Sequence, residues 1–315
     1  LLLATRADGR SESTVTSYRS KLGHLVDFLG GDVAIEEITV QDLRRYIVDL
    51  QDRDQIYEDH PNHDPRAGQL SPFTINSYVR SMKRLFNFLE EEGEIEANPV
   101  RRIKTPRASR DVPHAITAED FLALLKSTEG EGLSDRRDRA IILFLGDTGC
   151  RVSGLCGLRI QDVNLEDGVA FVREKGADVR PVVFSAITAA ALRDWLAARP
   201  TGEERGAWVF VSLAQTVKGQ MTRGAIAKML KRRAQRLGIK GRVNPHSLRH
   251  AFAREYLLNG GDLGTLSDLM GHSSVEVTKS FYAIFTIEEL KREHHKHSPV
   301  NNLLGGDNDD DDSGS

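Results

Sequence analysis

The chain has 315 residues, of which 39% are hydrophobic and 28% are charged, so it is long enough for about two domains with packed cores. No apolar run approaches the length of a membrane span, and the opening Leu1–Ala4 segment is too short for a signal sequence. Its two cysteines, Cys150 and Cys156, form neither a CxxC pair nor a disulfide framework, which argues against a disulfide-stabilised secreted domain and predicts a reducing, cytoplasmic setting.

The formal net charge is −3, but the charges are unevenly distributed. Five of the 46 acidic residues are aspartates within residues 301–315, and without them 41 acidic residues stand against 43 basic ones. No Asp or Glu occurs between Glu204 and Glu255. This basic window contains Arg205, Lys218, Arg223, Lys228, Lys231, Arg232, Arg233, Arg236, Lys240, Arg242, Arg249 and Arg254. A helix face that is merely solvated usually mixes both signs, so the window predicts a polyphosphate partner.

Residues 10–92 are expected to form a small all-helical domain, because apolar residues recur at helical spacing behind polar caps. Its predicted helices cover residues 13–29 with Ser13 as the cap, a segment that begins at the cap Thr39, and residues 71–89 after Ser71-Pro72. Residues 54–70 are polar and contain two prolines, so we expect a loop there. Lys83 and Arg84 on the third helix are candidates for contacts with phosphates.

Residues 93–113 are expected to be a basic interdomain linker, because they contain three prolines and no clear periodicity. Arg101, Arg102 and Lys104 give it the charge to lie along a nucleic-acid duplex. A linker that is basic only for solubility is an equally good interpretation.

Residues 114–300 predict a second domain of mixed structure. A helix capped by Thr117 and a helix over 135–147 come first, followed by a β-hairpin made of residues 169–172 and 179–184 with Lys175 at its tip. The remaining predicted elements are helices at 186–199, 222–237, 245–258, 262–270, 274–284 and 287–297, and a short strand over 208–211. Arg223, Lys228, Arg232 and Arg242 are its candidate phosphate contacts. The acidic tail, residues 301–315, is expected to be disordered.

The run Pro245-His246-Ser247-Leu248-Arg249 contains two side chains suited to binding a phosphoryl group, and further candidate residues lie upstream and downstream of it. His246 and Arg249 are three residues apart and project from one side of a helix. Arginine offers a planar fork to two phosphoryl oxygens, and histidine adds a hydrogen bond or a proton. Upstream lie Arg151, after Thr148-Gly149-Cys150, and Lys175; downstream lie His272, after Gly271, and Tyr282, after Phe281.

The order Arg, Lys, His-x-x-Arg, His, Tyr resembles the tyrosine recombinases, the phage-integrase and Xer-like family, over about residues 10–295. The resemblance implies a mainly α (α+β) protein: an N-terminal helical core-binding (SAM-like) DNA-binding domain and a C-terminal catalytic domain with a small β-sheet. It also implies a site-specific recombinase that cleaves and rejoins double-stranded DNA through a 3′-phosphotyrosine, without metal or cofactor. We then expect a nucleoid-associated homotetramer on paired sites, with the segment around 287–297 packing on a neighbouring protomer.

The resemblance also implies a role for each matched residue. Tyr282 would be the nucleophile, and Arg151 and Arg249 would clamp the non-bridging phosphate oxygens. Lys175 would protonate the leaving 5′ oxygen. His246 and His272 would hydrogen-bond the phosphate or move protons. Ordinary structural roles remain open: a salt bridge for Arg151, solubility for Lys175, a helix cap for His272 and a core position for Tyr282.

Two positions depart from the family pattern. Gly154 stands where the family usually has an acidic residue, three after the first arginine. Tyr282 follows His272 by ten residues instead of nine, and the ninth position is Phe281. Two alternatives therefore stay open: DNA relaxation of the type IB topoisomerase kind, and a non-catalytic DNA-binding protein on a disabled recombinase fold.

Overall fold

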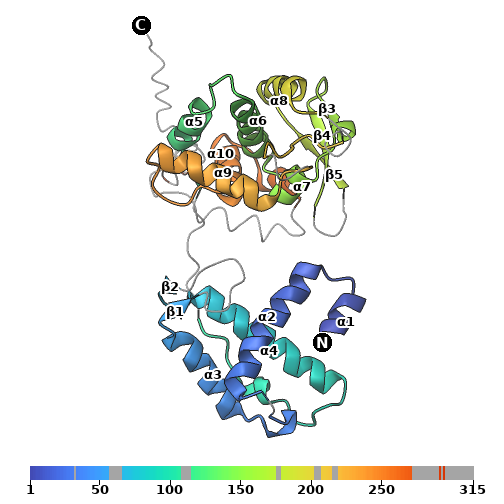
Figure 1. Cartoon of the computed structure of the whole chain (residues 1–315), viewed down its shortest axis with the longest axis vertical. Coiled ribbons are helices and arrows are strands. Elements are labelled where there is room, and N and C mark those ends of the chain that lie inside the picture. Colours follow the sequence, from blue (N-terminus) through green and yellow to red (C-terminus); the bar gives the residue numbers. More distant parts are fainter. Residues whose placement is uncertain are drawn as a thin grey trace, which may run out of the picture. The chain divides into compact units, whose positions relative to one another are not determined.

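The computed structural model describes residues 1–31, 33–56, 66–107, 115–174, 179–201, 207–214 and 219–271, with positions 291 and 294. The chain divides into two compact units, Leu1–Asp111 and Val112–Ser315, which are described separately (Figure 1). None of the described helices is both long and apolar enough to cross a membrane.

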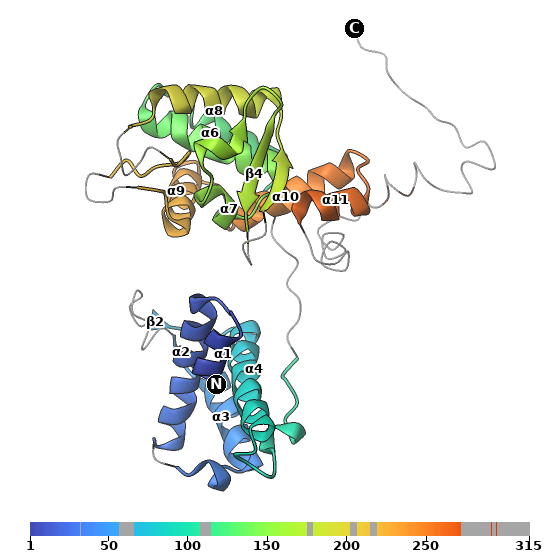
Figure 2. The same ribbon diagram turned by 90° about the vertical axis from the view of Figure 1, so that its right-hand side faces the viewer.

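The first unit is a helical bundle around one apolar core (Figure 2). Its helices are α1 (Leu2–Ala7), α2 (Glu12–Leu29), α3 (Val40–Asp52) and α4 (Pro72–Glu91). The predicted caps act at two of them: Thr39 forms a capping box with Asp42 on α3, and the Ser71 side chain accepts from the Thr74 N–H on α4. Tyr46 and Phe86 are fully buried between these helices.

Sequence reasoning was wrong in three places in this unit. Helix α2 begins at Glu12, one residue earlier than predicted, and its N-cap is Ser11 and not Ser13; α1 was not predicted. Short antiparallel strands β1 (Gln55–Ile56) and β2 (Arg66–Ala67) lie in the segment expected to be a loop.

The expected linker is partly a folded segment of this unit. A 3₁₀ helix, η2 (Pro99–Arg102), lies within it, and Ile95, Val100 and Ile103 are buried in the core of the first unit. Burial of three apolar side chains stabilises one packed conformation of this segment over a solvated, extended one. For this reason residues 95–103 are not the extended linker that their proline content predicts.

The second unit surrounds the helix α6, whose residues 140–145 are all buried. Its helices are α5 (Ala118–Lys126), α6 (Leu133–Thr148), α7 (Val152–Cys156), η3 (Ile160–Asp162), α8 (Ala186–Ala198), α9 (Arg223–Arg236), α10 (Pro245–Leu258) and α11 (Leu263–Met270). Helices α8 and α10 both contact α6, and α10 also contacts α11 (Figure 2). This contact joins the predicted His246 helix to the helix that ends just before His272.

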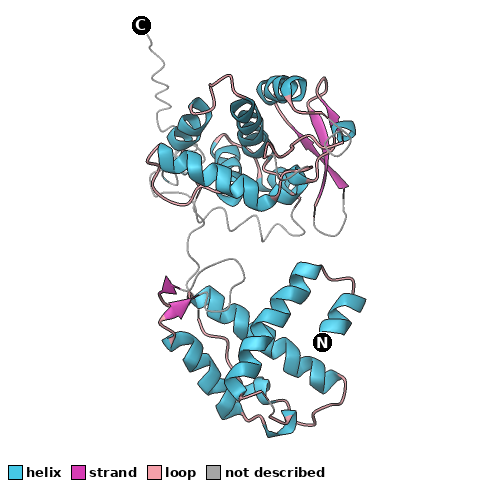
Figure 3. Cartoon of the chain, viewed as in Figure 1, coloured by secondary structure: helices cyan, strands magenta, loops and turns pink. Residues whose placement is uncertain are grey.

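A three-stranded antiparallel sheet lies at one side of the second unit (Figure 3). Its strands are β3 (Val163–Asn164), β4 (Val169–Arg173) and β5 (Val179–Val183). The predicted hairpin is β4–β5, and Arg173 pairs with Val179 at the end where the connecting segment leaves the two strands. The predicted strand over 208–211 is instead two isolated bridges, Arg159–Trp208 and Val211–Gln220. Val209, Phe210 and Val211 are buried and Trp208 is half-buried. The Val209 carbonyl accepts from the Trp195 indole at 2.8 Å.

Candidate active site

The first two turns of α10 present His246 and Arg249. The Asn244 side chain accepts from the Ser247 N–H, and the Ser247 hydroxyl accepts from the Asn244 N–H, which completes a capping box. Pro245 occupies the first helical position, where its missing N–H costs nothing. Two reciprocal hydrogen bonds between Asn244 and Ser247 therefore fix the start of the helix that carries His246 and Arg249.

Arg249 is buried, with 6% of its surface exposed, whereas His246 is exposed. The guanidinium of Arg249 donates to the carbonyl of Gly149 at 2.5 Å and to that of Met270 at 2.8 Å. Burial, together with repulsion from Arg151, lowers the pKa of Arg249 to about 10, so it remains charged at neutral pH. Helix α10 thus supplies a fixed cation beside an accessible imidazole.

A tight turn between α6 and α7 presents Arg151. Gly149 ends α6 at φ +56°, and a Cβ there would lie 2.3 Å from the Phe252 ring, so only glycine fits. Arg151 is the N-cap residue of α7, and its side chain is 34% exposed. Its Nη2 donates to the carbonyl of Gly271 at 3.3 Å.

Glu174, at the end of β4, is a central residue of the site that sequence reasoning missed. Its side chain is only 5% exposed and accepts from the Arg151 backbone N–H at 2.9 Å, from Arg151 Nη1 and from Arg180 Nη2 at 3.1 Å. Burial raises the pKa of the Glu174 carboxyl, but these hydrogen bonds and the arginine charges outweigh it, and the pKa lies below its usual value. Its only sequence signal was the missing acid at Gly154.

Arg180, on β5, is the second residue that sequence reasoning missed. With Arg151 and Arg249 it holds the C-terminal end of α11 through three consecutive backbone carbonyls. The contacts pair Arg180 with Leu269 at 2.7 Å, Arg249 with Met270 at 2.8 Å, and Arg151 with Gly271 at 3.3 Å. Cations at a helix C-terminus are favourable because they complement its dipole. The chain continues from this anchored end directly into His272.

This cluster gathers several cations around one buried carboxylate. Arg151 and Arg180 donate to Glu174, and the Glu174 charge also acts on Arg249. The buried setting strengthens the fields of these guanidinium groups relative to water. A cluster of this kind suits a phosphodiester anion, to which arginine binds with two parallel hydrogen bonds.

The structure describes three of the six predicted catalytic residues, and it places Arg151 and Arg249 on the same end of α11 with His246 one turn before Arg249. Lys175, His272 and Tyr282 lie outside the described residues. So do the predicted helix at 274–284, the acidic tail 301–315 and, apart from positions 291 and 294, the predicted helix at 287–297.

The predicted phosphate contacts of the second unit are on its surface. Arg223, Lys228 and Arg232 are exposed on α9, and Arg242 is exposed in the segment before α10. Arg233, also on α9, is turned to a structural use, because it forms ion pairs inside the unit. Its partners are Asp135 at 2.7 Å and Asp138 at 2.8 Å.

The predicted contacts of the first unit are more mixed. Arg102 and Lys104 are exposed, and Lys83 is half-buried on α4. Arg84 forms an ion pair with Glu91 at 3.4 Å, and Arg101 forms one with Glu90 at 2.8 Å. A neighbouring carboxylate weakens the attraction of each for a phosphate.

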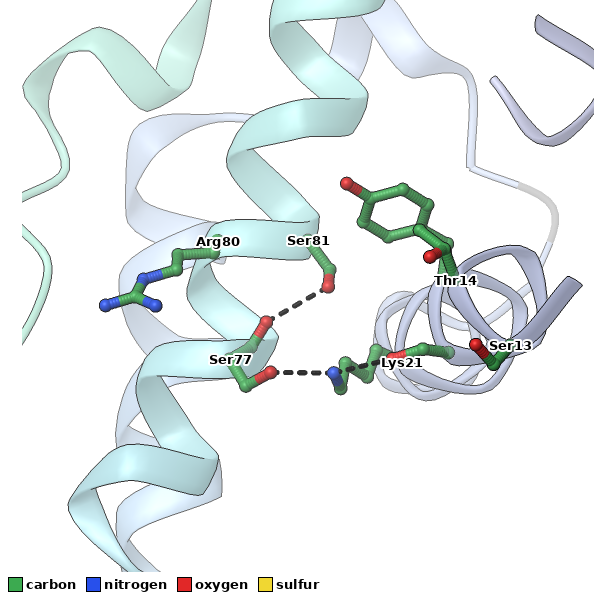
Figure 4. A pocket seen from close by; sticks show the side chains of 8 residues that line it. Ser13, Thr14, Lys21, Ser77, Arg80 and Ser81 are labelled. Carbon is green, nitrogen blue, oxygen red and sulfur yellow. Dashed lines mark hydrogen bonds between the residues drawn. The ribbon is translucent and has the colours of Figure 1, made fainter. Parts of the chain in front are cut away.

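A polar pocket between α2 and α4 offers a better-placed cationic surface in this unit (Figure 4). Lys21 reaches across it and donates to Ser17 at 2.8 Å and to Ser77 at 2.7 Å (Figure 4). Burial lowers the pKa of Lys21. The lining residues are two cations and six hydroxyl-bearing residues: Lys21, Arg80, Ser13, Thr14, Ser17, Tyr18, Ser77 and Ser81. This composition, without a carboxylate among the lining residues, fits phosphate oxygens, and neither cation was predicted.

Comparison with known proteins supports the predicted family. The sequence profile of the phage integrase family matches residues 114–287. The chain is 29% identical over 293 residues to tyrosine recombinase XerC of Oceanobacillus iheyensis, covering 92% of this chain and 91% of that protein. It is 31% identical over 245 residues to tyrosine recombinase XerA of Pyrococcus furiosus, covering 77% and 80%.

Solved structures share the fold. The Tn1549 transposon integrase in complex with transposon right end DNA superimposes with a TM-score of 0.72 at 20% identity, covering 93% of this chain and 96% of that one. The XerH recombinase bound to a palindromic difH substrate gives a TM-score of 0.71 at 19% identity, covering 92% and 82%.

A mainly helical unit with a small antiparallel sheet, and with two arginines on the end of one helix, defines a catalytic domain of the tyrosine recombinase type. The chain belongs to the phage integrase family. The predicted family, fold class and activity are thereby confirmed: this is a tyrosine recombinase, an enzyme that breaks and rejoins DNA strands.

Proposed function

We propose that this protein recombines double-stranded DNA at specific sites, with Arg151, Arg249 and His246 holding the scissile phosphate and Tyr282 attacking it. The observation that carries the proposal is the convergence of Arg151 and Arg249 on adjacent carbonyls, those of Gly271 and Met270. Two guanidinium groups fixed side by side stabilise the charge that develops on a pentavalent phosphate.

In the proposed cleavage step, the phenolic oxygen of Tyr282 forms a bond to phosphorus and the bond to the 5′ oxygen breaks. Lys175 donates the proton that the 5′ oxygen takes up, and the tyrosine proton leaves to a base. The product is a 3′-phosphotyrosine and a free 5′ hydroxyl. Attack by a 5′ hydroxyl from a second duplex reverses these steps and rejoins the strand. The phosphodiester bond energy is retained, so rejoining needs no other energy source.

Basic surfaces on both units support DNA as the partner. We propose that exposed cations on α9 and the Lys21–Arg80 pocket contact backbone phosphates. We further propose that the enzyme works as a homotetramer on paired sites, with the segment around 287–297 packing on a neighbour. It would act on DNA in the cytoplasm, at the nucleoid.

The test is a plasmid that carries two copies of the DNA flanking this protein's own gene. Recombination between the copies resolves the plasmid into two circles, and it requires both sites. Relaxation of a plasmid without the flanks would indicate topoisomerase-like use. Salt-sensitive binding with neither product would favour the binding-only alternative, and a second set of flanking sequences separates that result from a wrong target.

A further inference from the structure

Glu174 is held from three directions although no role was expected for it. One of its oxygens accepts from the Arg151 backbone N–H at 2.9 Å and from Arg180 at 3.1 Å, and the other accepts from Arg151 Nη1. The side chain is 5% exposed and its carboxylate is satisfied. A carboxylate held this firmly fixes the guanidinium that it faces.

Gly154 leaves the space that Glu174 fills. It lies on α7, three residues after Arg151. A Cβ at Gly154 would lie 3.1 Å from the Cβ of Val172 and 3.5 Å from the Cγ of Glu174. A side chain at position 154 would therefore point into the region where the Glu174 carboxylate now meets Arg151.

We propose that Glu174 is the positioning residue for Arg151, and that it supplies from the end of β4 the carboxylate that related enzymes place three residues after the first arginine. This inference rests on the proposed function, because Arg151 is taken to bind the scissile phosphate. The observed side-chain contacts use two of the five N–H donors of Arg151, Nη1 to Glu174 and Nη2 to Gly271, and leave three for phosphate oxygens.

The inference makes a reciprocal prediction. In this chain, the glutamate at 174 orients Arg151 and position 154 is glycine. We expect a variant with glutamate at 154 and glycine at 174 to orient Arg151 equally well. Either single change breaks the arrangement. Glu174→Gly leaves Arg151 without its carboxylate, and Gly154→Glu places a second carboxylate against the first, where like charges repel.

The first experiment compares four proteins: the wild type, Glu174→Gly, Gly154→Glu and the double variant. It measures single-turnover cleavage and DNA affinity with a nicked duplex that carries the flanks of the gene. We expect Glu174→Gly to lower the cleavage rate constant by about 100-fold, with DNA affinity changed by less than about 2-fold. Gly154→Glu should also be slow. The double variant should recover to within about 10-fold of wild type. The control is Glu166→Gly, an exposed glutamate in the turn before β4, which should cleave like wild type.

A second measurement does not depend on a DNA substrate. The free energies of unfolding of the same four proteins are compared in the wild-type background and with Arg151→Ala. We expect the double variant to be more stable than the sum of the single changes predicts. This coupling should shrink without Arg151, because only the direct repulsion between the side chains at 154 and 174 then remains. Additive effects in both measurements would overturn the inference. If the wild type cleaves but the double variant is not rescued, only the inference fails. If the wild type never cleaves although the stability coupling is present, the proposed function fails and the carboxylate placement stands.

Discussion

Arg249 combines a permanent charge with near-complete burial, which is unfavourable unless its donors are used. Two of them are fixed by the carbonyls of Gly149 and Met270, so the side chain is already oriented before a phosphate arrives. Preorganisation of this kind lowers the cost of reaching the transition state.

We predict that Arg249→Ala lowers the single-turnover cleavage rate by about 10²–10³. Arg249→Lys should recover only part of it, because an ammonium lacks the planar fork. The control is Arg254→Ala on the same helix, since Arg254 forms an ion pair with Glu255 at 2.5 Å. Equal losses for Arg249→Ala and Arg254→Ala would mean that Arg249 stabilises the helix without contacting phosphate.

His250 makes a pH-dependent contribution to stability. Burial, with His246 and Arg249 nearby, lowers the pKa of His250 to about 4 from a usual value near 6.5. Between pH 4 and 6.5, His250 is protonated in the unfolded state and neutral in the folded state. The free energy of unfolding therefore falls as the pH falls from about 6.5 to 4. We predict a shallower fall for His250→Gln, measured by urea unfolding at pH 7, 5.5 and 4.5. Parallel curves for the two proteins would contradict this.

At the scale of elements, the C-terminal end of α11 is where the parts of the site meet. Arginines from α7, β5 and α10 hold its last carbonyls, so the two predicted catalytic arginines and the start of the His272 segment share one anchor. Movement of this helix end would disturb both arginines together.

We predict that Arg180→Ala increases amide hydrogen exchange in α11 and lowers the free energy of unfolding by about 1.5–3 kcal/mol, the usual range for a hydrogen bond to a charged group. The matched control is Arg173→Ala, an exposed arginine on the adjacent strand. Unchanged exchange in α11 for Arg180→Ala would show that Arg180 does not anchor the helix end.

Local signals predicted most of the described helices, since apolar spacing and caps such as Thr39 act within one element. The order of motifs, through the resemblance to the tyrosine recombinases, predicted Arg151, His246 and Arg249 as residues of one site. Neither source predicted Glu174 or Arg180, because their roles come from contacts with Arg151 and α11, which are distant in sequence. The segment 95–103 was misread for a related reason: burial of Val100 and Ile103 depends on helices formed elsewhere in the chain.

At the scale of the whole molecule, the net charge conceals the basic surfaces of both units. Exposed cations on α9 and the pocket between α2 and α4 give each unit its own cationic surface. Binding through phosphates releases counterions, so affinity should fall steeply with salt.

We predict that Arg80→Ala weakens DNA binding similarly for all sequences and reduces the slope of log affinity against log salt by about 1. The control is Arg45→Ala, because Arg45 is exposed on α3 and pairs with Asp42 at 3.5 Å. An unchanged slope for Arg80→Ala would remove the α2–α4 pocket from the DNA interface.

The most direct measurement is covalent trapping on nicked DNA from the flanks of the gene, without metal or ATP, followed by mapping of the modified residue. We predict an adduct that survives SDS, carries the DNA 3′ end on Tyr282, and disappears with Tyr282→Phe. It should persist with Tyr256→Phe, the control, because Tyr256 lies within α10. An adduct that survives Tyr282→Phe, or one mapped to another residue, would contradict the account.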